Sequence, residues 1–129
     1  MRDLKSNIFT ALCIAPSVHS ATKSDGAVVD LQGCGSAAVV VTTGAIAGDG
    51  DFTASLVVGD AADLSGGAAA TADELIGAFP ATLAANSAVT VGYRGGKRYA
   101  RVVLTKNGGT SIAASAVIVK GDLALRGGL

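Results

Sequence analysis

Hydrophobic and polar residues alternate from Val89 to Lys106, on both sides of the pair Gly95-Gly96. Every second residue from Val89 to Tyr93 is apolar, and Ala100, Val102 and Leu104 share one face after the glycines. A period of two is typical of a β-strand. A two-residue type I′ loop needs φ > 0 at both positions, which glycine adopts freely. The pattern therefore predicts two strands joined as a hairpin at Gly95-Gly96.

Short apolar runs bounded by glycine predict the remaining strands. They span residues 8–14, 27–31, 36–43, 52–58 and 111–119. The run 36–43 is rich in β-branched residues and is expected to be a buried strand. Residues 48–51 are expected to form a turn and 59–72 a surface loop. The sequence Thr71-Ala-Asp-Glu74 is a capping box and predicts one short helix near 72–77.

These elements favour an all-β fold, with residues 1–129 forming a single-domain antiparallel β-sandwich that is jelly-roll-like. A barrel stays open, because the sequence does not give the strand order. Residues 1–7 are expected to form an extended N-terminal arm. Arg2 and Lys5 before the apolar run 8–15 loosely imitate a secretory signal, but Asp3 and Pro16 interrupt it, and we expect a first strand there.

The composition is low in charge for a lone domain. Charged residues make up 16% of the 129 residues, against about 25% in typical domains, and hydrophobic residues make up 50%. One interpretation is that much of the surface is covered in an assembly. The other is that alanine and glycine raise the apolar fraction without creating an adhesive surface. We favour the assembly.

Acidic and basic residues occupy different parts of the chain. Residues 25–74 hold eight acidic and no basic side chains, whereas residues 94–126 hold seven basic ones and a single acid. The strands either interleave and neutralise this difference, or the molecule docks through complementary patches. For docking to a like subunit or to a capsid we single out six residues: Arg94, Lys97, Arg98, Arg101, Asp73 and Glu74. The net charge of zero argues against direct nucleic-acid binding.

Catalytic motifs are not evident in the sequence. His19 is the single histidine, in a Ser/Thr-rich stretch, and is expected to be a solvated loop residue. The run Asp49-Gly50-Asp51 has too few carboxylates for a calcium loop and is expected to be a turn. Cys13 and Cys34 are expected to be buried free thiols, with one Cys13–Cys34 bridge left open. We therefore expect no enzyme, no cofactor and no metal.

Four segments together resemble a family of small proteins of tailed bacteriophages and prophages, encoded near the major capsid gene. They are 1–4, 29–33 together with 36–41, 76–79 and 91–103, and the most specific is Val-Gly-Tyr-Arg-Gly-Gly-Lys-Arg-Tyr-Ala-Arg at 91–101. The resemblance runs across nearly the whole chain. It implies a structural protein of the virion, located in the head, and supplies no catalytic residue.

The leading hypothesis is a capsid decoration, or cement, protein. Its expected partners are the major capsid protein and copies of itself, most simply as a trimer, with no membrane involved. It would be made in the host bacterial cytoplasm and located on the capsid surface. A head–tail connector or tail component is one alternative. Another is a carbohydrate-binding module on the virion surface that uses Tyr93, Tyr99 and Arg101.

Overall fold

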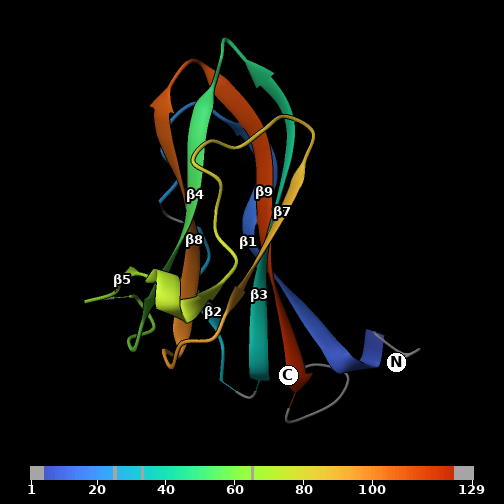
Figure 1. Ribbon diagram of the computed structural model, residues 1–129, viewed down its shortest axis with the longest axis vertical. Coiled ribbons are helices and arrows are strands. Elements are labelled where there is room, and N and C mark those ends of the chain that lie inside the picture. The colour runs from blue at the N-terminus through green and yellow to red at the C-terminus, as the bar shows by residue number, and fades with distance from the viewer. Residues whose placement is uncertain (1–4, 25, 33, 65, 124–129) are drawn as a thin grey trace.

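Two antiparallel sheets pack face to face as a sandwich in the computed structural model (Figure 1). The structure describes residues 5–24, 26–32, 34–64 and 66–123, without the side chains of Cys34, Asp122 and Leu123. The first sheet, sheet A, has the strand order β1-β9-β3-β7-β6. The second, sheet B, has the order β2-β8-β4-β5. The predicted all-β sandwich is confirmed.

The strand bounds are as follows. Sheet A contains β1 (Ile8–His19), β3 (Cys34–Ala47), β6 (Leu75–Ile76), β7 (Ala88–Tyr93) and β9 (Ser111–Leu123). Sheet B contains β2 (Val29–Asp30), β4 (Asp51–Gly59), β5 (Ala68–Ala69) and β8 (Tyr99–Gly108). Two 3-10 turns, η1 (Lys5–Asn7) and η2 (Ala72–Glu74), complete the described elements.

One long antiparallel ribbon, folded over at its middle, forms the centre of both sheets. In sheet A, β3 pairs with β9 from Cys34↔Leu123 to Ala47↔Ser111. The same two chain segments then cross to sheet B, where β4 pairs with β8 from Asp51↔Gly108 to Gly59↔Tyr99. The two crossing turns lie at the top of Figure 1. They approach closely, since a Cβ on Gly109, whose φ is +72°, would overlap the Asp49 carbonyl group.

The predicted hairpin at Gly95-Gly96 is wrong, although its two strands exist. β7 pairs with β3 and β6 in sheet A, whereas β8 pairs with β4 and β2 in sheet B. Neither Gly95 nor Gly96 has a positive φ, so the loop is not a type I′ turn. It crosses from one sheet to the other. Alternation shows that each strand has an inner face, but it does not show which strand is the neighbour.

Three further elements differ from the prediction in extent. β1 continues beyond residue 14 to His19 through two register shifts, and Pro16 is tolerated because β1 is an edge strand. At η2 the Glu74 carboxylate accepts hydrogen bonds from the backbone and hydroxyl of Thr71, as the capping box predicts. The helical turn ends at Glu74 because Leu75 and Ile76 pair with β7. Of the predicted arm, residues 5–7 form η1, and residues 1–4 lie outside the described residues.

Inward-facing residues of the two sheets form one core. Phe52, Val102 and Leu104 of sheet B meet Val41 and Ile112 of sheet A, and all five are fully buried. One side of the sandwich is closed by Cys13, whose thiol accepts the Val102 N–H and donates to the Ala27 carbonyl. The other side is closed by the segment 77–87, where the buried Leu83 donates its N–H to the Phe52 carbonyl.

The lone histidine and the described cysteine are both buried. His19 is 8% exposed, so the expected solvated loop position is wrong, and the side chain lies at the end of β1. Its Nε2 atom lies 3.2 Å from the Ala114 carbonyl oxygen, to which it donates. Cys13 is a free thiol, and burial raises its pKa, which keeps it protonated and unreactive. The side chain of Cys34 lies outside the described residues.

Candidate functional site

Five of the six predicted site residues gather at one end of the sandwich. Arg94, Lys97 and Arg98 lie in the loop between β7 and β8, at the lower end of the view in Figure 1. Asp73 and Glu74 belong to η2, whose backbone receives this loop: the Glu74 carbonyl accepts the Arg94 N–H, and the Asp73 carbonyl accepts Arg94 Nε at 2.9 Å. We call this region, with Asp30 and Asp60, the charged end.

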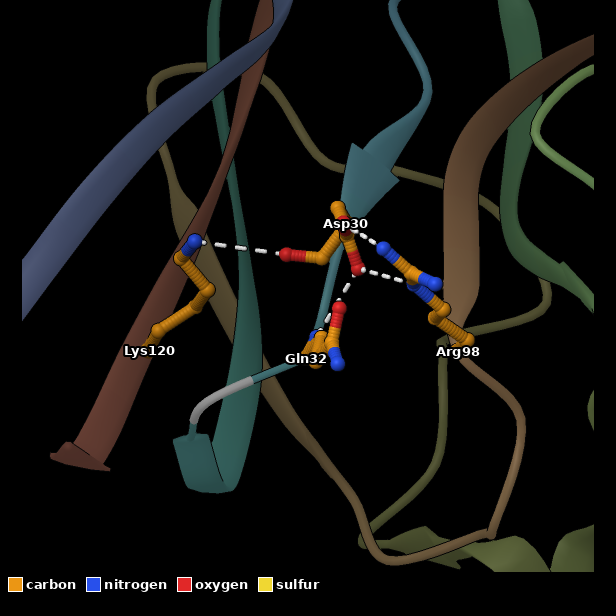
Figure 2. Close-up of polar contacts among 4 residues, drawn as sticks. All are labelled: Asp30, Gln32, Arg98 and Lys120. Carbon is orange, nitrogen blue, oxygen red and sulfur yellow. Dashed lines mark hydrogen bonds and ion pairs between the residues drawn. The ribbon is translucent and has the colours of Figure 1, made fainter. Parts of the chain in front are cut away.

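Asp30 is the most connected group of the charged end (Figure 2). Its carboxylate receives Arg98 Nε at 3.0 Å and Nη2 at 2.9 Å, in a bidentate ion pair. The same carboxylate accepts the Gln32 N–H at 2.9 Å. These hydrogen bonds, with Arg98 as the largest cause, lower the pKa of Asp30 from 3.8 to about 2. Asp30 is therefore ionised throughout the physiological pH range.

Lys120 links this pair to the other sheet. It is an inward-facing residue of β9, only 7% exposed, and its ammonium donates to the Asp30 carbonyl at 3.3 Å. The ammonium also lies 4.8 Å from the centroid of the Phe9 ring, a cation–π distance. The contact joins β9 of sheet A to β2 of sheet B, so the charged end fastens the two sheets together.

A second ion pair is more exposed. Lys97 Nζ lies 3.0 Å from Asp60, with side chains 47% and 74% exposed. The hydrogen bond that Lys97 donates to the Asp60 carboxylate raises the pKa of Lys97. Exposed pairs of this kind contribute little to stability. Within the described part of the chain, the acidic and basic segments thus meet inside one subunit. Contact of the six residues singled out from the sequence with a second protein stays a prediction.

Arg101 is separate from the charged end. It lies within β8, between the buried core residues Ala100 and Val102, so its side chain points to the outer face of sheet B. Its Nε atom is buried and finds no hydrogen-bond acceptor among the described residues. Tyr93 and Tyr99, proposed above as carbohydrate-binding residues, do not lie on one surface. Tyr93 faces inward from β7 of sheet A, and Tyr99 belongs to β8 of sheet B.

A hollow of about 640 Å³ opens beside the charged end. Its lining combines apolar groups of sheet A with the charged loop: Leu31, Gln32, Gly35, Ser36, Ala37, Ile76, Tyr93, Arg94, Gly95, Gly96, Lys97 and Arg98. Lys97 and Arg98 are paired with carboxylates, whereas the third lining cation, Arg94, donates to the Asp73 backbone carbonyl instead.

The outer face of sheet A is a second candidate, which the sequence prediction missed. The register places outward residues in rows across the strands, for example Leu12, Val117, Val40 and Thr90. The outward set includes Ile8, Thr10, Leu12, Val18, Ser36, Ala38, Val40, Thr42, Ile76, Ala88, Thr90, Gly92, Ala113, Ser115, Val117, Val119 and Gly121. None of these described residues is charged. We call this surface the uncharged face.

Large apolar side chains are exposed on the uncharged face. Leu12 is 54%, Val18 69% and Ile76 60% exposed, although side chains of this kind are normally buried. Beside Val18 lies a shallow hollow of about 340 Å³ between β1, β9 and β3, lined by uncharged residues that include Thr42, Gly44 and Ala113. Contiguous apolar surface of this kind marks interaction sites in soluble proteins.

The outer face of sheet B has a different character. It presents Thr53, Ser55 and Val57 from β4, and Arg101, Val103 and Thr105 from β8, so polar and charged groups surround two valines. Asn107 bridges Thr53 and Asp51 with hydrogen bonds of 2.7 and 3.5 Å. This face is polar, and water can hydrogen-bond to it without a protein partner.

A local signal for the uncharged face exists in the sequence. Residues 36–43 and 111–119 hold no charged residue in either of their two alternating sets. For residues 36–43 this pattern predicts a buried strand. In the structure only one face of β3 is in the core, where Val39 and Val41 are buried, and Val40 points outward.

No group of three or more metal-ligating side chains occurs among the residues that the structure describes. No helix within the described ranges is long and apolar enough to cross a membrane. Comparisons with protein-family models, with curated proteins and with solved structures found no significant match.

Proposed function

We propose that this chain is a structural protein of a tailed-phage virion, and specifically a capsid decoration protein that binds the outside of the shell and stabilises it. The observation that carries the proposal is the uncharged face, which extends over all five strands of sheet A. The resemblance to phage head proteins supplies the biological setting.

The uncharged face supports a role in an assembly on energetic grounds. Removing apolar surface from water yields about 25 cal/mol per Å². Leu12, Val18 and Ile76 are exposed in the isolated chain, so a partner that covers them gains this free energy without having to desolvate a charged group on this face. The cores of protein interfaces are depleted of charged residues in the same way.

The charged end supports the proposal through rigidity. The Asp30–Arg98 pair and the Lys120 contact tie β2, β8 and β9 together across both sheets. A cement protein must transmit force between neighbouring shell subunits without unfolding. A sandwich fastened at one end by these contacts, and at the other by the folded ribbon, suits this task.

The test is to purify particles from a phage that encodes this chain and to measure its copy number. A decoration protein is expected at a copy number comparable to that of the major capsid protein, and on the outer surface in a particle reconstruction. Particles that lack the chain should release DNA at a lower temperature than complete particles.

Two results would contradict the decoration role. If the chain occurs in far fewer copies and at a single vertex, it is a connector or tail component. If purified particles do not contain it, the virion role itself is wrong.

A further inference from the structure

We infer that the uncharged face of sheet A binds the same face of a second copy of this chain, forming a two-fold symmetric dimer. The inference rests on the assembly role proposed above and assigns this surface to the contact between copies, so the shell would be bound through another surface of the dimer. A two-fold contact gives a dimer where the sequence prediction favoured a trimer. The inference needs only the purified protein for its test, so it can fail while the capsid role stands.

The absence of charge favours a copy of the chain as the occupant. In a two-fold contact the same patch lies on both partners, so every charged residue near the axis faces its own equivalent. Like charges brought together in this way cost several kcal/mol. The described outward residues of β1, β3, β6, β7 and β9 carry no charge, so the face opposes itself without repulsion.

The size of the face is sufficient for a stable dimer. The strands β1, β9 and β3 have 12, 13 and 14 residues, so at about 3.3 Å per residue and about 4.8 Å between strands they cover roughly 14 Å by 40 Å. Their flat projection is therefore on the order of 500–600 Å². The shorter β7 and β6, of six and two residues, add to this area. Accessible area exceeds this because side chains stand above the sheet. Stable complexes bury about 800 Å² per partner, so one face can supply most of such an interface.

The uncharged face has both protruding and low side chains, a shape that can fit a second copy of itself. Leu12, Val18 and Ile76 protrude, whereas Ala38, Ala88 and Gly92 are low. The hollow near Thr42 and Ala113 adds a recess with uncharged walls. Sheets that pack face to face interdigitate large and small residues in this manner, about 10 Å apart. Protrusions and recesses on one surface allow it to fit its own copy.

The experiment compares two exposed threonines on the outer faces of the two sheets. Thr90→Lys places a charge on the uncharged face, and Thr105→Lys places the same charge on the polar face of sheet B. Both side chains are exposed, so both variants are expected to fold as the parent does, which circular dichroism and urea unfolding verify. Sedimentation equilibrium then gives the dimer dissociation constant of each protein.

The parent and Thr105→Lys are expected to be dimers of similar affinity. Thr90→Lys is expected to weaken the dimer at least about 100-fold, because two lysines are desolvated per two-fold contact. Leu12→Lys, at the other side of the face, is expected to act in the same direction. A monomeric parent at high concentration would overturn the inference, as would equal effects of Thr90→Lys and Thr105→Lys. An oligomer that survives both face variants would show that the copies meet elsewhere.

Discussion

The charged end and the uncharged face of this sandwich differ in how far their groups find partners within the chain. At the charged end, Asp30, Asp60, Arg94, Lys97 and Arg98 are bonded to other residues of the same subunit. On the uncharged face, Leu12, Val18 and Ile76 remain exposed to solvent. Charged groups with partners in the same subunit need no second protein, whereas exposed apolar groups gain free energy only when a partner covers them.

Because of this difference, the uncharged face of sheet A replaces the basic loop between β7 and β8 as the expected contact surface. Sequence reasoning placed assembly at the basic loop, because charge is easy to recognise in a sequence. The structure shows carboxylates of the same chain beside Lys97 and Arg98. The surface without charge is the better candidate for contact, and the charged end is a fastening between the sheets.

The largest loss of stability is expected when a charge is placed on the inner side of β3, and a much smaller loss when it is placed on the outer side. Val41 is fully buried, and its neighbour Val40 points outward. Val41→Lys buries an unpaired ammonium and is expected to cost about 4–5 kcal/mol of unfolding free energy. Val40→Lys is expected to cost about 1 kcal/mol in the isolated subunit, because the lysine ammonium can reach water from the outer face. Urea denaturation at low protein concentration measures both. Equal losses would show that the outward side of β3 is not a free surface.

The next effect concerns the link between the sheets. Lys120→Ala removes the bond to the Asp30 carbonyl, the contact with the Phe9 ring and the packing of a buried stem. We expect a loss of about 1–2 kcal/mol in thermal or urea unfolding. Dimer affinity should not change, because Lys120 faces inward. A changed affinity with unchanged stability would place Lys120 in the contact surface.

A smaller effect depends on pH. The pKa of Asp30 is depressed to about 2 from 3.8, so its ionised form stabilises the fold above about pH 4. That contribution is lost as the pH falls through about 2. Because the pair is partly exposed, Asp30→Asn is expected to cost no more than about 1 kcal/mol at pH 7. The difference between parent and variant should shrink in unfolding curves as the pH falls toward 2 and disappear about one unit below it. A difference that persists there would assign the effect to something other than this charge.

The smallest effect is expected at the most exposed pair. Asp60→Asn removes the ion pair with Lys97, whose partners are both largely exposed. Neither the unfolding free energy nor the dimer dissociation constant should change measurably. A larger dimer dissociation constant for Asp60→Asn would show that the charged end takes part in the contact between subunits.

The sequence was sufficient to locate the long strands and the sandwich class. Alternation identified β8, and apolar runs bounded by turns identified β4 and most of β9. Neither pattern identified the neighbours of β7 and β8, since a glycine-containing loop either reverses a strand within a sheet or crosses to the other sheet. The register of strands far apart in the chain depends on the packing of the whole core.

The candidate site was predicted less well than the fold. The six selected residues were charged, and five of them do come together, but with partners inside the subunit. Outward positions such as Val40, Val117 and Thr90 were missed, because an outer face without charge has the same local pattern as a buried one. Burial in the monomer and burial in an assembly leave the same signature in a sequence.

If a second copy covers the uncharged face, residues on that face must be protected from solvent in the assembled protein. Thr90→Cys and Thr105→Cys each place one thiol on the outer face of sheet A or sheet B, and the parent, with its buried Cys13, gives the background. The rate of labelling by a thiol reagent is measured in the assembled state and after dilution to monomers. We predict that Thr90→Cys is protected in the assembly and reacts on dilution, whereas Thr105→Cys reacts at the same rate in both states. Equal labelling of the two variants in the assembly would contradict the account.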